Sequence, residues 1–287
     1  MAPMSQLQNA SLVLEGGTFR TLFTAGVLDA FIDEKIKLPY IVAISAGAIN
    51  ACSYVTEQRE RTLRIITNYR HDKRYMGIGN FLKERSYFGL DFAYNILPNE
   101  LDVFDWETYR QFDGKVEFGV TNAYTGEVEY VDALTMDAHC TMLRATCAIP
   151  LLFPEIKLND TPYYDGGLAD PLPVKQAEQH GFSKHIFVLT RPKGYRKEMD
   201  GKSKWVMKLL ARKYPALAKA MASRVERYND TLAYIESLEE QGKAFIFRPD
   251  YAVNSFEKHV PTMHKTYQMG YEQAMRRLAE LSSFIVK

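Results

Sequence analysis

Short apolar runs alternate with segments of helical apolar spacing in the first part of the chain. Residues 11–14 (SLVL) form a β-rich run that ends at Gly16 and Gly17, and the apolar residues that follow recur every three or four positions. Residues 39–44 (PYIVAI) predict a second strand, and the small residues after Ser45 suit a helix packed closely on a sheet. The pattern of strand, turn and helix therefore occurs twice, which predicts parallel strands covered by helices.

The alternation continues along the rest of the chain, except over residues 56–106, whose pattern gives no clear assignment. A glycine-containing turn between two alternating runs predicts a hairpin, and the run HIFVLT predicts another buried parallel strand. The remaining expectations are hairpin strands over 116–121 and 128–131, a helix over 136–148 ended by Pro150, strands over 185–190 and 244–247, helical segments over 203–241 with a break at Pro215, and a closing helix over 262–285.

No internal repeat, low-complexity tract or linker divides the 287 residues, so we expect one domain with a sizeable core. Residues 8–190 are expected to form the core that carries the chemistry. Residues 191–287 are expected to be a mainly helical part of the same domain, and a candidate lid or membrane-facing flap.

The composition is that of a soluble globular protein, with 46% hydrophobic and 25% charged residues. A net charge of +1 gives no attraction to nucleic acid. Cys52, Cys140 and Cys147 lack the spacing of a zinc site or a redox pair, so we expect them to be reduced and buried, with no metal bound. The first ten residues lack a secretory signal and no apolar run is long enough to span a membrane, which predicts a cytoplasmic protein that could still touch the inner face of a membrane.

Ser45 stands where a predicted strand turns sharply into a helix, which is the geometry of a nucleophile elbow. Small residues two positions before and after the serine, Ala43 and Gly47, let the strand and the helix approach closely. Ala43 occupies the position that is usually glycine. Such a five-residue pattern is common by chance, so alone it does not decide the function.

A short loop before the first predicted helix could hold negative charge on its backbone N–H groups. The loop consists of Gly16, Gly17, Thr18 and Phe19, and Arg20 follows it. A dinucleotide-binding fingerprint would need further glycines where the chain has Thr18 and Thr21, so a nicotinamide or flavin site is disfavoured and no cofactor is expected. An oxyanion hole needs only backbone donors and fits better, although a plain tight turn stays open. Arg20 could brace this loop or bind a lipid phosphate.

Asp165 is followed by Gly166 and Gly167, which permit a tight loop that projects the carboxylate. An aspartate followed by glycine is also among the commonest turn sequences, so alone the pair indicates no more than a β-turn.

Three stretches taken together resemble the bacterial patatin-like phospholipases. They are LVLEGGTFRTLFTAGVLDAF, IVAISAGAINA and RATCAIPLLFPEIKLNDTPYYDGGLADPLP, and they span residues 12–173. The resemblance implies a three-layer α/β/α sandwich with a mainly parallel central sheet and a Ser–Asp dyad without histidine. The chain departs from the family pattern at Ala43, at Thr18 in place of the third loop glycine, and at Thr21 in place of the glycine after Arg20.

The resemblance also implies a mechanism. Ser45 would attack a fatty acyl ester of a lipid, with Asp165 as general base, and form an acyl-serine that water hydrolyses. The N–H groups of the loop from Gly16 to Phe19 would hold the oxyanion. Arg20, Gly47, Gly166 and Gly167 would support the site. The expected activity is that of a phospholipase A or a lysophospholipase.

Two alternatives remain at this stage. An α/β-hydrolase triad could use His259 or His264, which follow Ser45 and Asp165 in the right order, but a serine after only the second strand argues against that fold. The chain could also be a lipid-binding or scaffold protein that has kept the fold and lost turnover, which the departures from the family pattern allow.

Residues 191–227 carry twelve Lys and Arg against three acidic residues, a net charge of +9. Because the whole chain carries +1, the remaining residues carry −8. We expect this segment to be a basic helical flap that contacts an anionic lipid surface. Its apolar stripe would be Trp205, Val206, Leu209 and Leu210, edged by Lys204, Lys208, Arg212 and Lys213. A helix that packs this stripe on the core is the plainer interpretation.

Overall fold

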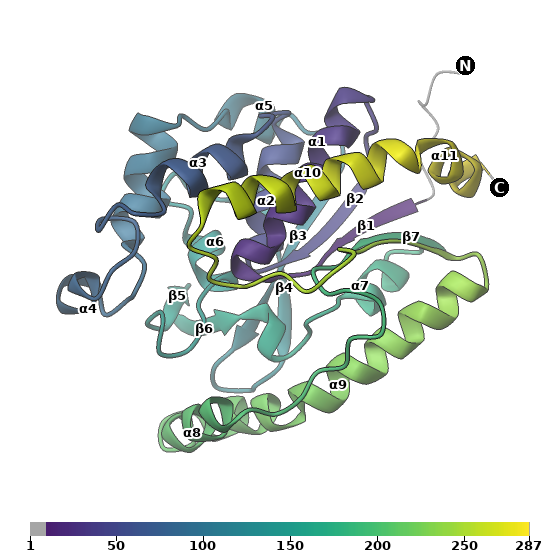
Figure 1. Cartoon of the computed structure of the whole chain (residues 1–287). Helices are drawn as coiled ribbons and strands as arrows, with labels where there is room; N and C mark the ends of the chain where they lie inside the picture. The colour runs from purple at the N-terminus through teal and green to yellow at the C-terminus, as the bar shows by residue number, and fades with distance from the viewer. Residues whose placement is uncertain (1–9, 287) are drawn as a thin grey trace.

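A single eight-stranded sheet runs through the computed structural model, which describes residues 10–286 (Figure 1). The strands lie in the order β5-β6-β3-β2-β1-β7-β8, and β4 pairs with β3. The pairs from β3 to β8 along this order are parallel, whereas β4, β5 and β6 pair antiparallel. The strands are β1 (Ala10–Leu14), β2 (Tyr40–Ile44), β3 (Lys115–Asn122), β4 (Val128–Asp132), β5 (Ile156–Leu158), β6 (Thr161–Asp165), β7 (Lys184–Val188) and β8 (Ala244–Phe247).

Helices cover both faces of the sheet because buried strands present apolar side chains to both sides. Leu12 and Leu14 of β1 join a core under α1, α2 and α10, whereas Val13 faces a second core under α7 and α9 (Figure 1). The helices are α1 (Leu22–Asp33), α2 (Ala46–Val55), α3 (Arg61–Tyr69), α4 (Gly79–Glu84), α5 (Trp106–Arg110), α6 (Thr141–Thr146), α7 (Val174–Gln179), α8 (Gly201–Leu210), α9 (Pro215–Glu240), α10 (Val260–Arg276) and α11 (Leu278–Val286).

The expected three-layer α/β/α architecture is confirmed, and so are both early strand-turn-helix units and the hairpin. All three cysteines are free and buried, as expected. Residues 8 and 9 of the expected core, and the leading residues from which no secretory signal was inferred, lie outside the described residues except for Ala10. β8 joins the same sheet as β1 to β7.

Two helical expectations were wrong in extent. The helix expected over 136–148 is confined to α6, because Cys140 adopts a left-handed φ of 52° that a helix interior does not contain. The closing helix is divided into α10 and α11 at Arg277. The unassigned residues 56–106 form α3, α4 and a π-helix, η2 (Phe92–Leu101).

Helices α1 and α10 touch each other through their backbones. A Cβ placed on Gly26 of α1 would lie 2.0 Å from the carbonyl oxygen of Tyr267, and one placed on Gly270 of α10 would lie 2.1 Å from that of Phe23. No side chain fits in either space, so the two glycines permit this crossing.

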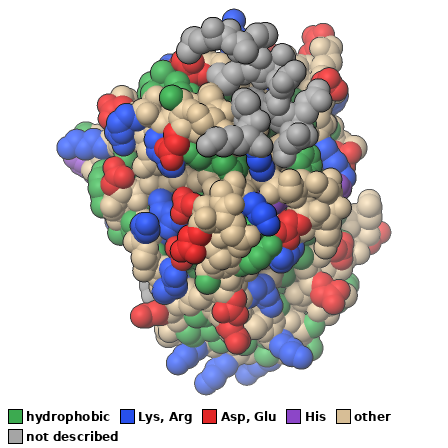
Figure 2. Space-filling model, turned by 90° about the vertical axis from the view of Figure 1, so that its right-hand side faces the viewer, with side chains coloured by type: hydrophobic (Ala, Val, Ile, Leu, Met, Phe, Trp, Pro, Cys, Tyr) green, Lys and Arg blue, Asp and Glu red, His purple; other side chains and the backbone are tan. Residues whose placement is uncertain are grey.

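The basic segment 191–227 contains α8 and the first half of α9, and the expected stripe on α8 is split between two faces. Trp205 and Leu209 are exposed, whereas Val206 is half-buried and Leu210 is buried. Figure 2 shows Lys and Arg side chains along the lower edge of the molecule, at the level where Figure 1 places α8 and the start of α9.

Candidate active site

Ser45 occupies the turn between β2 and α2 in a conformation that few non-glycine residues adopt, with φ 54° and ψ −131°. Its N–H donates to Thr146 Oγ1 at 2.9 Å, and Thr146 Oγ1 donates to the carbonyl oxygen of Gly119 at 2.7 Å. The threonine hydroxyl therefore ties the elbow to β3. Such over-determined strain clusters at functional positions.

The residues that flank the elbow are as small as the turn requires. A Cβ on Gly47 would lie 2.8 Å from the carbonyl oxygen of Leu14, so no larger residue fits without a shift. Ala43 is fully buried and packs in the core beneath α1 and α2. The core thus accommodates the methyl group of Ala43, which stands where the family pattern has glycine.

Strand β3 brings Ser45 and Asp165 together. Ile44, the last residue of β2, pairs with Gly119, and Asp165, the last residue of β6, pairs with the next residue, Val120. β4 pairs with one edge of β3 at Val120. β2 and β6 therefore lie one after the other along the opposite edge of β3. The two strands end at adjacent positions. The Ser45 side chain consequently lies close enough to the Asp165 carboxylate to lower its pKa.

The surroundings of Asp165 shift the pKa of its carboxyl group. Burial raises the pKa of this carboxyl above its usual value, while the hydrogen bond from Ser45 and the nearby Arg224 cation lower it without cancelling the effect of burial. The N–H of Gly167 donates to Asp165 Oδ1 at 2.8 Å. A Cβ on Gly166 would lie 2.1 Å from the carbonyl oxygen of Gly119, so this position also requires glycine.

The glycine loop lies against the nucleophile, since a Cβ on Gly16 would be 2.8 Å from Ser45 Cβ. The N–H groups of Gly16, Gly17 and Thr18 have no acceptor among the described residues, whereas that of Phe19 donates to the carbonyl oxygen of Ser255 at 3.1 Å. Thr18 has a φ of 52°, which explains why glycine suits this position.

Arg20 makes contacts that brace this loop. Its Nε donates to Thr190 Oγ1 at 3.3 Å, and its Nη1 donates to Ser255 Oγ. Thr190 Oγ1 in turn donates to the carbonyl oxygen of Gly16 at 3.1 Å. The guanidinium thus connects the loop to β7 and to the segment before α10.

Sequence reasoning missed several charged groups around the site. Arg224 of α9 donates to the carbonyl oxygen of Gly167 at 2.5 Å, and burial together with Arg224 lowers the pKa of Lys197 to about 8. Buried Glu15 accepts from the Thr190 N–H at 2.5 Å and from the Tyr228 hydroxyl at 3.0 Å. Glu15 directly precedes the two glycines and could have been noticed. Arg224 could not, because nothing local separates it from its basic neighbours.

A largely apolar cavity opens beside Ser45. Many of its walls come from residues 56–106, the segment whose pattern gave no assignment. Its lining includes Ile49, Ile66, Phe88, Tyr94, Leu143 and Phe153. A cavity with this apolar lining suits a small hydrophobic ligand.

No histidine of the described residues contacts Ser45 or Asp165. His259 is exposed and hydrogen-bonds Thr262 Oγ1 at 3.1 Å, and His264 is exposed on α10. His185 is buried on β7 beside Ser11 Oγ at 2.8 Å. The arrangement gives no support to a histidine triad.

Within residues 10–286, no group of three or more His, Cys, Asp or Glu side chains is placed to hold a metal ion. In the same part of the chain, no helix combines the length and the apolar character needed to cross a bilayer.

Comparisons with known proteins identify a family over more than half of the chain. Residues 12–178 match the family described as patatin-like phospholipase, and residues 214–286 match a domain of unknown function, DUF6363. The chain is 23% identical over 283 residues to YjjU, an uncharacterized protein of Escherichia coli, and the match covers 94% of this chain and 78% of YjjU. Among solved structures it is similar to VipD from Legionella pneumophila, with a TM-score of 0.48 and 14% identity over 95% of this chain and 67% of VipD.

Proposed function

The chain belongs to the patatin-like phospholipase family, and from that premise we propose that it is a serine acyl hydrolase that cleaves fatty acyl esters of lipids through a Ser45–Asp165 dyad. The observation that carries the proposal is the register on β3, which ends β2 and β6 at adjacent positions and supports the proximity of the two side chains. The apolar cavity beside Ser45 supplies a place for the acyl chain.

In the first half of the reaction, Ser45 Oγ attacks the ester carbonyl carbon while Asp165 accepts the hydroxyl proton. The carbonyl oxygen becomes an oxyanion, and the N–H groups of Gly16, Gly17 and Thr18 are the available donors. Asp165 then returns the proton to the departing alcohol, which leaves an acyl-serine. In the second half, water attacks the acyl-serine and Asp165 accepts its proton, so that the fatty acid is released.

The test is hydrolysis of p-nitrophenyl esters and of phospholipid by the purified protein. Ser45→Ala and Asp165→Ala should each remove nearly all activity, and the double variant should lose little more, because the two residues act as one unit. Ser283→Ala, at an exposed position of α11, serves as the matched control, and circular dichroism checks that each variant folds. A double variant much weaker than either single variant would contradict the shared mechanism.

Mass spectrometry of the protein after brief exposure to substrate gives a second measurement. An adduct on Ser45 with the mass of the acyl group is expected. A wild-type protein that binds lipid but forms no adduct and hydrolyses no ester would instead be a binding protein with this fold.

We also propose that α8 brings the site to an anionic lipid surface. Trp205 and Leu209 project from α8, and Lys204, Lys208 and Arg212 are exposed beside them. An exposed aromatic residue among basic side chains is the arrangement of a helix that lies in a membrane interface.

A further inference from the structure

The cavity beside Ser45 follows one face of α2. Ser45, Ile49 and Cys52 line it in succession, each about one turn after the last. Cys52 lies seven residues beyond Ser45, which places it roughly 10 Å farther along the helix axis. An acyl group attached to Ser45 that follows this wall therefore extends away from the reacting atoms toward Cys52.

A buried guanidinium lies at that far end. Arg61, the first residue of α3, lines the cavity and is only 6% exposed. Its Cζ lies 5.2 Å from the centre of the Phe104 ring, and its charge acts on the thiols of Cys52 and Cys140, which also line the cavity. The apolar channel thus leads to a cation.

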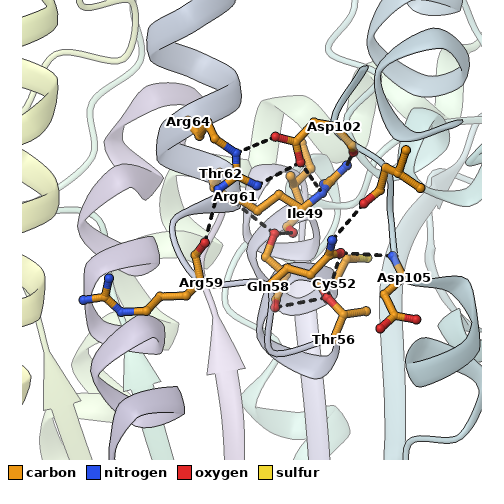
Figure 3. Close-up of polar contacts among 12 residues, drawn as sticks. Ile49, Cys52, Thr56, Gln58, Arg59, Arg61, Thr62, Arg64, Asp102 and Asp105 are labelled. Atoms are coloured by element: carbon orange, nitrogen blue, oxygen red, sulfur yellow. Dashed lines mark hydrogen bonds and ion pairs between the residues drawn. The ribbon is translucent and has the colours of Figure 1, made fainter. Parts of the chain in front are cut away.

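The carboxylate that faces Arg61 is already shared. Arg64 donates to both oxygens of Asp102, at 2.6 and 3.0 Å (Figure 3). Arg61 Nη2 donates to the main-chain oxygen of Asp102 at 3.0 Å, and Arg61 Nε lies 3.2 Å from the carboxylate without forming a hydrogen bond. Two guanidiniums therefore share one carboxylate.

Arg61 keeps unused hydrogen-bonding capacity. Its Nε has no hydrogen-bond partner, and its Nη1 donates to none of the described groups. A buried charge is costly unless it is paired and hydrogen-bonded. The methyl end of an ordinary fatty acyl chain offers no acceptor to the free N–H groups of Arg61, whereas a carboxylate could accept hydrogen bonds from them.

We propose that the cavity accepts an acyl chain whose far end carries a carboxylate, which Arg61 binds, so that preferred substrates are esters of dicarboxylic acids. This inference rests on the proposed esterase activity and names its substrate class. Arg61 is then a specificity-determining residue, and the ester bond at Ser45 is broken as in any other substrate.

The test compares p-nitrophenyl monoesters of dicarboxylic acids with p-nitrophenyl esters of monocarboxylic acids of the same carbon number, over a series of chain lengths. At the length that reaches Arg61, the wild type should favour the carboxylate-ended ester in kcat/KM by ~10–100-fold, the range of one hydrogen bond between charged groups. Arg61→Met, which removes the charge, should reverse this preference.

Two variants control for indirect effects. Arg61→Lys keeps the charge and should retain part of the preference. Arg110→Met removes an exposed arginine of α5 that does not line the cavity, and its preference should match that of the wild type. The preference is a ratio measured on one protein, so a general loss of stability does not move it.

The outcomes separate the two proposals. Hydrolysis of alkyl esters with rejection of carboxylate-ended esters at every length would overturn the role of Arg61 and leave the esterase standing. If no ester is hydrolysed, the esterase fails, and the melting temperature of Ser45→Ala protein with monomethyl azelate, which has one carboxylate, or methyl nonanoate, which has none, still tests the site. A larger increase with monomethyl azelate than with methyl nonanoate, retained in Ser45→Ala/Arg61→Lys and lost in Ser45→Ala/Arg61→Met, supports the site, and equal increases refute it.

Discussion

Asp165, the proposed general base, can accept a proton only while it is ionised, and its surroundings decide the pH at which that holds. Burial raises its pKa, so activity should fall as the pH drops through a value above that of an ordinary carboxyl group. Arg224 lowers this pKa, and Arg224→Met should therefore move the acidic limb of the profile to higher pH. Profiles of kcat/KM against pH measure the shift. Arg224→Lys keeps the charge and should stay near the wild type, and an unmoved limb in Arg224→Met would exclude an influence of this cation.

His185 makes the stability of the fold depend on pH. Burial lowers its pKa to about 4 from an ordinary value near 6.5, so the unfolded chain binds the proton more tightly. Its contribution is complete above pH 6.5 and is lost as the pH falls toward 4. Between pH 7.5 and pH 5 the wild type should lose roughly 2 kcal/mol relative to His185→Gln, which does not titrate. Urea unfolding at both pH values measures this, and a difference independent of pH would contradict it.

The residues that were predicted from sequence are those whose chemistry is local. Ser45 and Gly47 are neighbours in one tight turn, and Asp165 is followed by the glycines that its own loop requires. Arg224 and Arg61 gain their positions only through packing between segments far apart in the chain, so their sequence neighbours carry no signal.

At the level of secondary structure, the glycines at the crossing of α1 and α10 give a sharp test. Gly270→Ala would place a Cβ against a backbone carbonyl oxygen that cannot move alone, so the helices must separate. We expect a loss of roughly 1–3 kcal/mol in the free energy of unfolding. Gly79→Ala on α4, where a Cβ meets nothing within 4 Å, is the matched control and should be close to neutral. Equal effects in chemical denaturation would show that the crossing is not tight.

Strands and helices with a regular apolar period were predictable because burial imposes that period. The extent of α6 was not predictable, because Cys140 adopts a left-handed backbone conformation and the helix can begin only after it. The secondary structure of residues 56–106 could not be predicted for a different reason. They line a cavity and bury aromatic side chains on several short elements, so no single period describes them.

At the scale of the whole molecule, residues 191–227 carry a net charge of +9, whereas all other residues together carry −8. Each basic residue near an anionic bilayer contributes on the order of 1 kcal/mol, so a few suffice for reversible binding. Vesicle co-sedimentation should rise with the fraction of anionic lipid and fall with salt. Reversing the charges of Lys204, Lys208 and Arg212 together should weaken it.

The control for vesicle binding reverses three exposed basic residues on the opposite side of the sheet, Lys258, Lys265 and Arg276, in or just before α10 (Figure 1). These changes should leave binding close to that of the wild type. Equal binding to neutral and anionic vesicles would rule out α8 as an electrostatic contact, and α8 would then be a helix packed on the core with a solvated basic face.

The close crossing of α1 and α10 at Gly26 and Gly270 also has a consequence for biosynthesis. The ribosome makes α1 early, yet the helix that covers it comes roughly 100 residues after Asp165. At the usual 5–20 residues per second, that delay is about 5–20 s. During it, the nascent chain already contains both members of the proposed dyad but presents an uncovered apolar layer. We expect such a chain to depend on chaperones and to gain hydrolytic activity only after α10 has emerged.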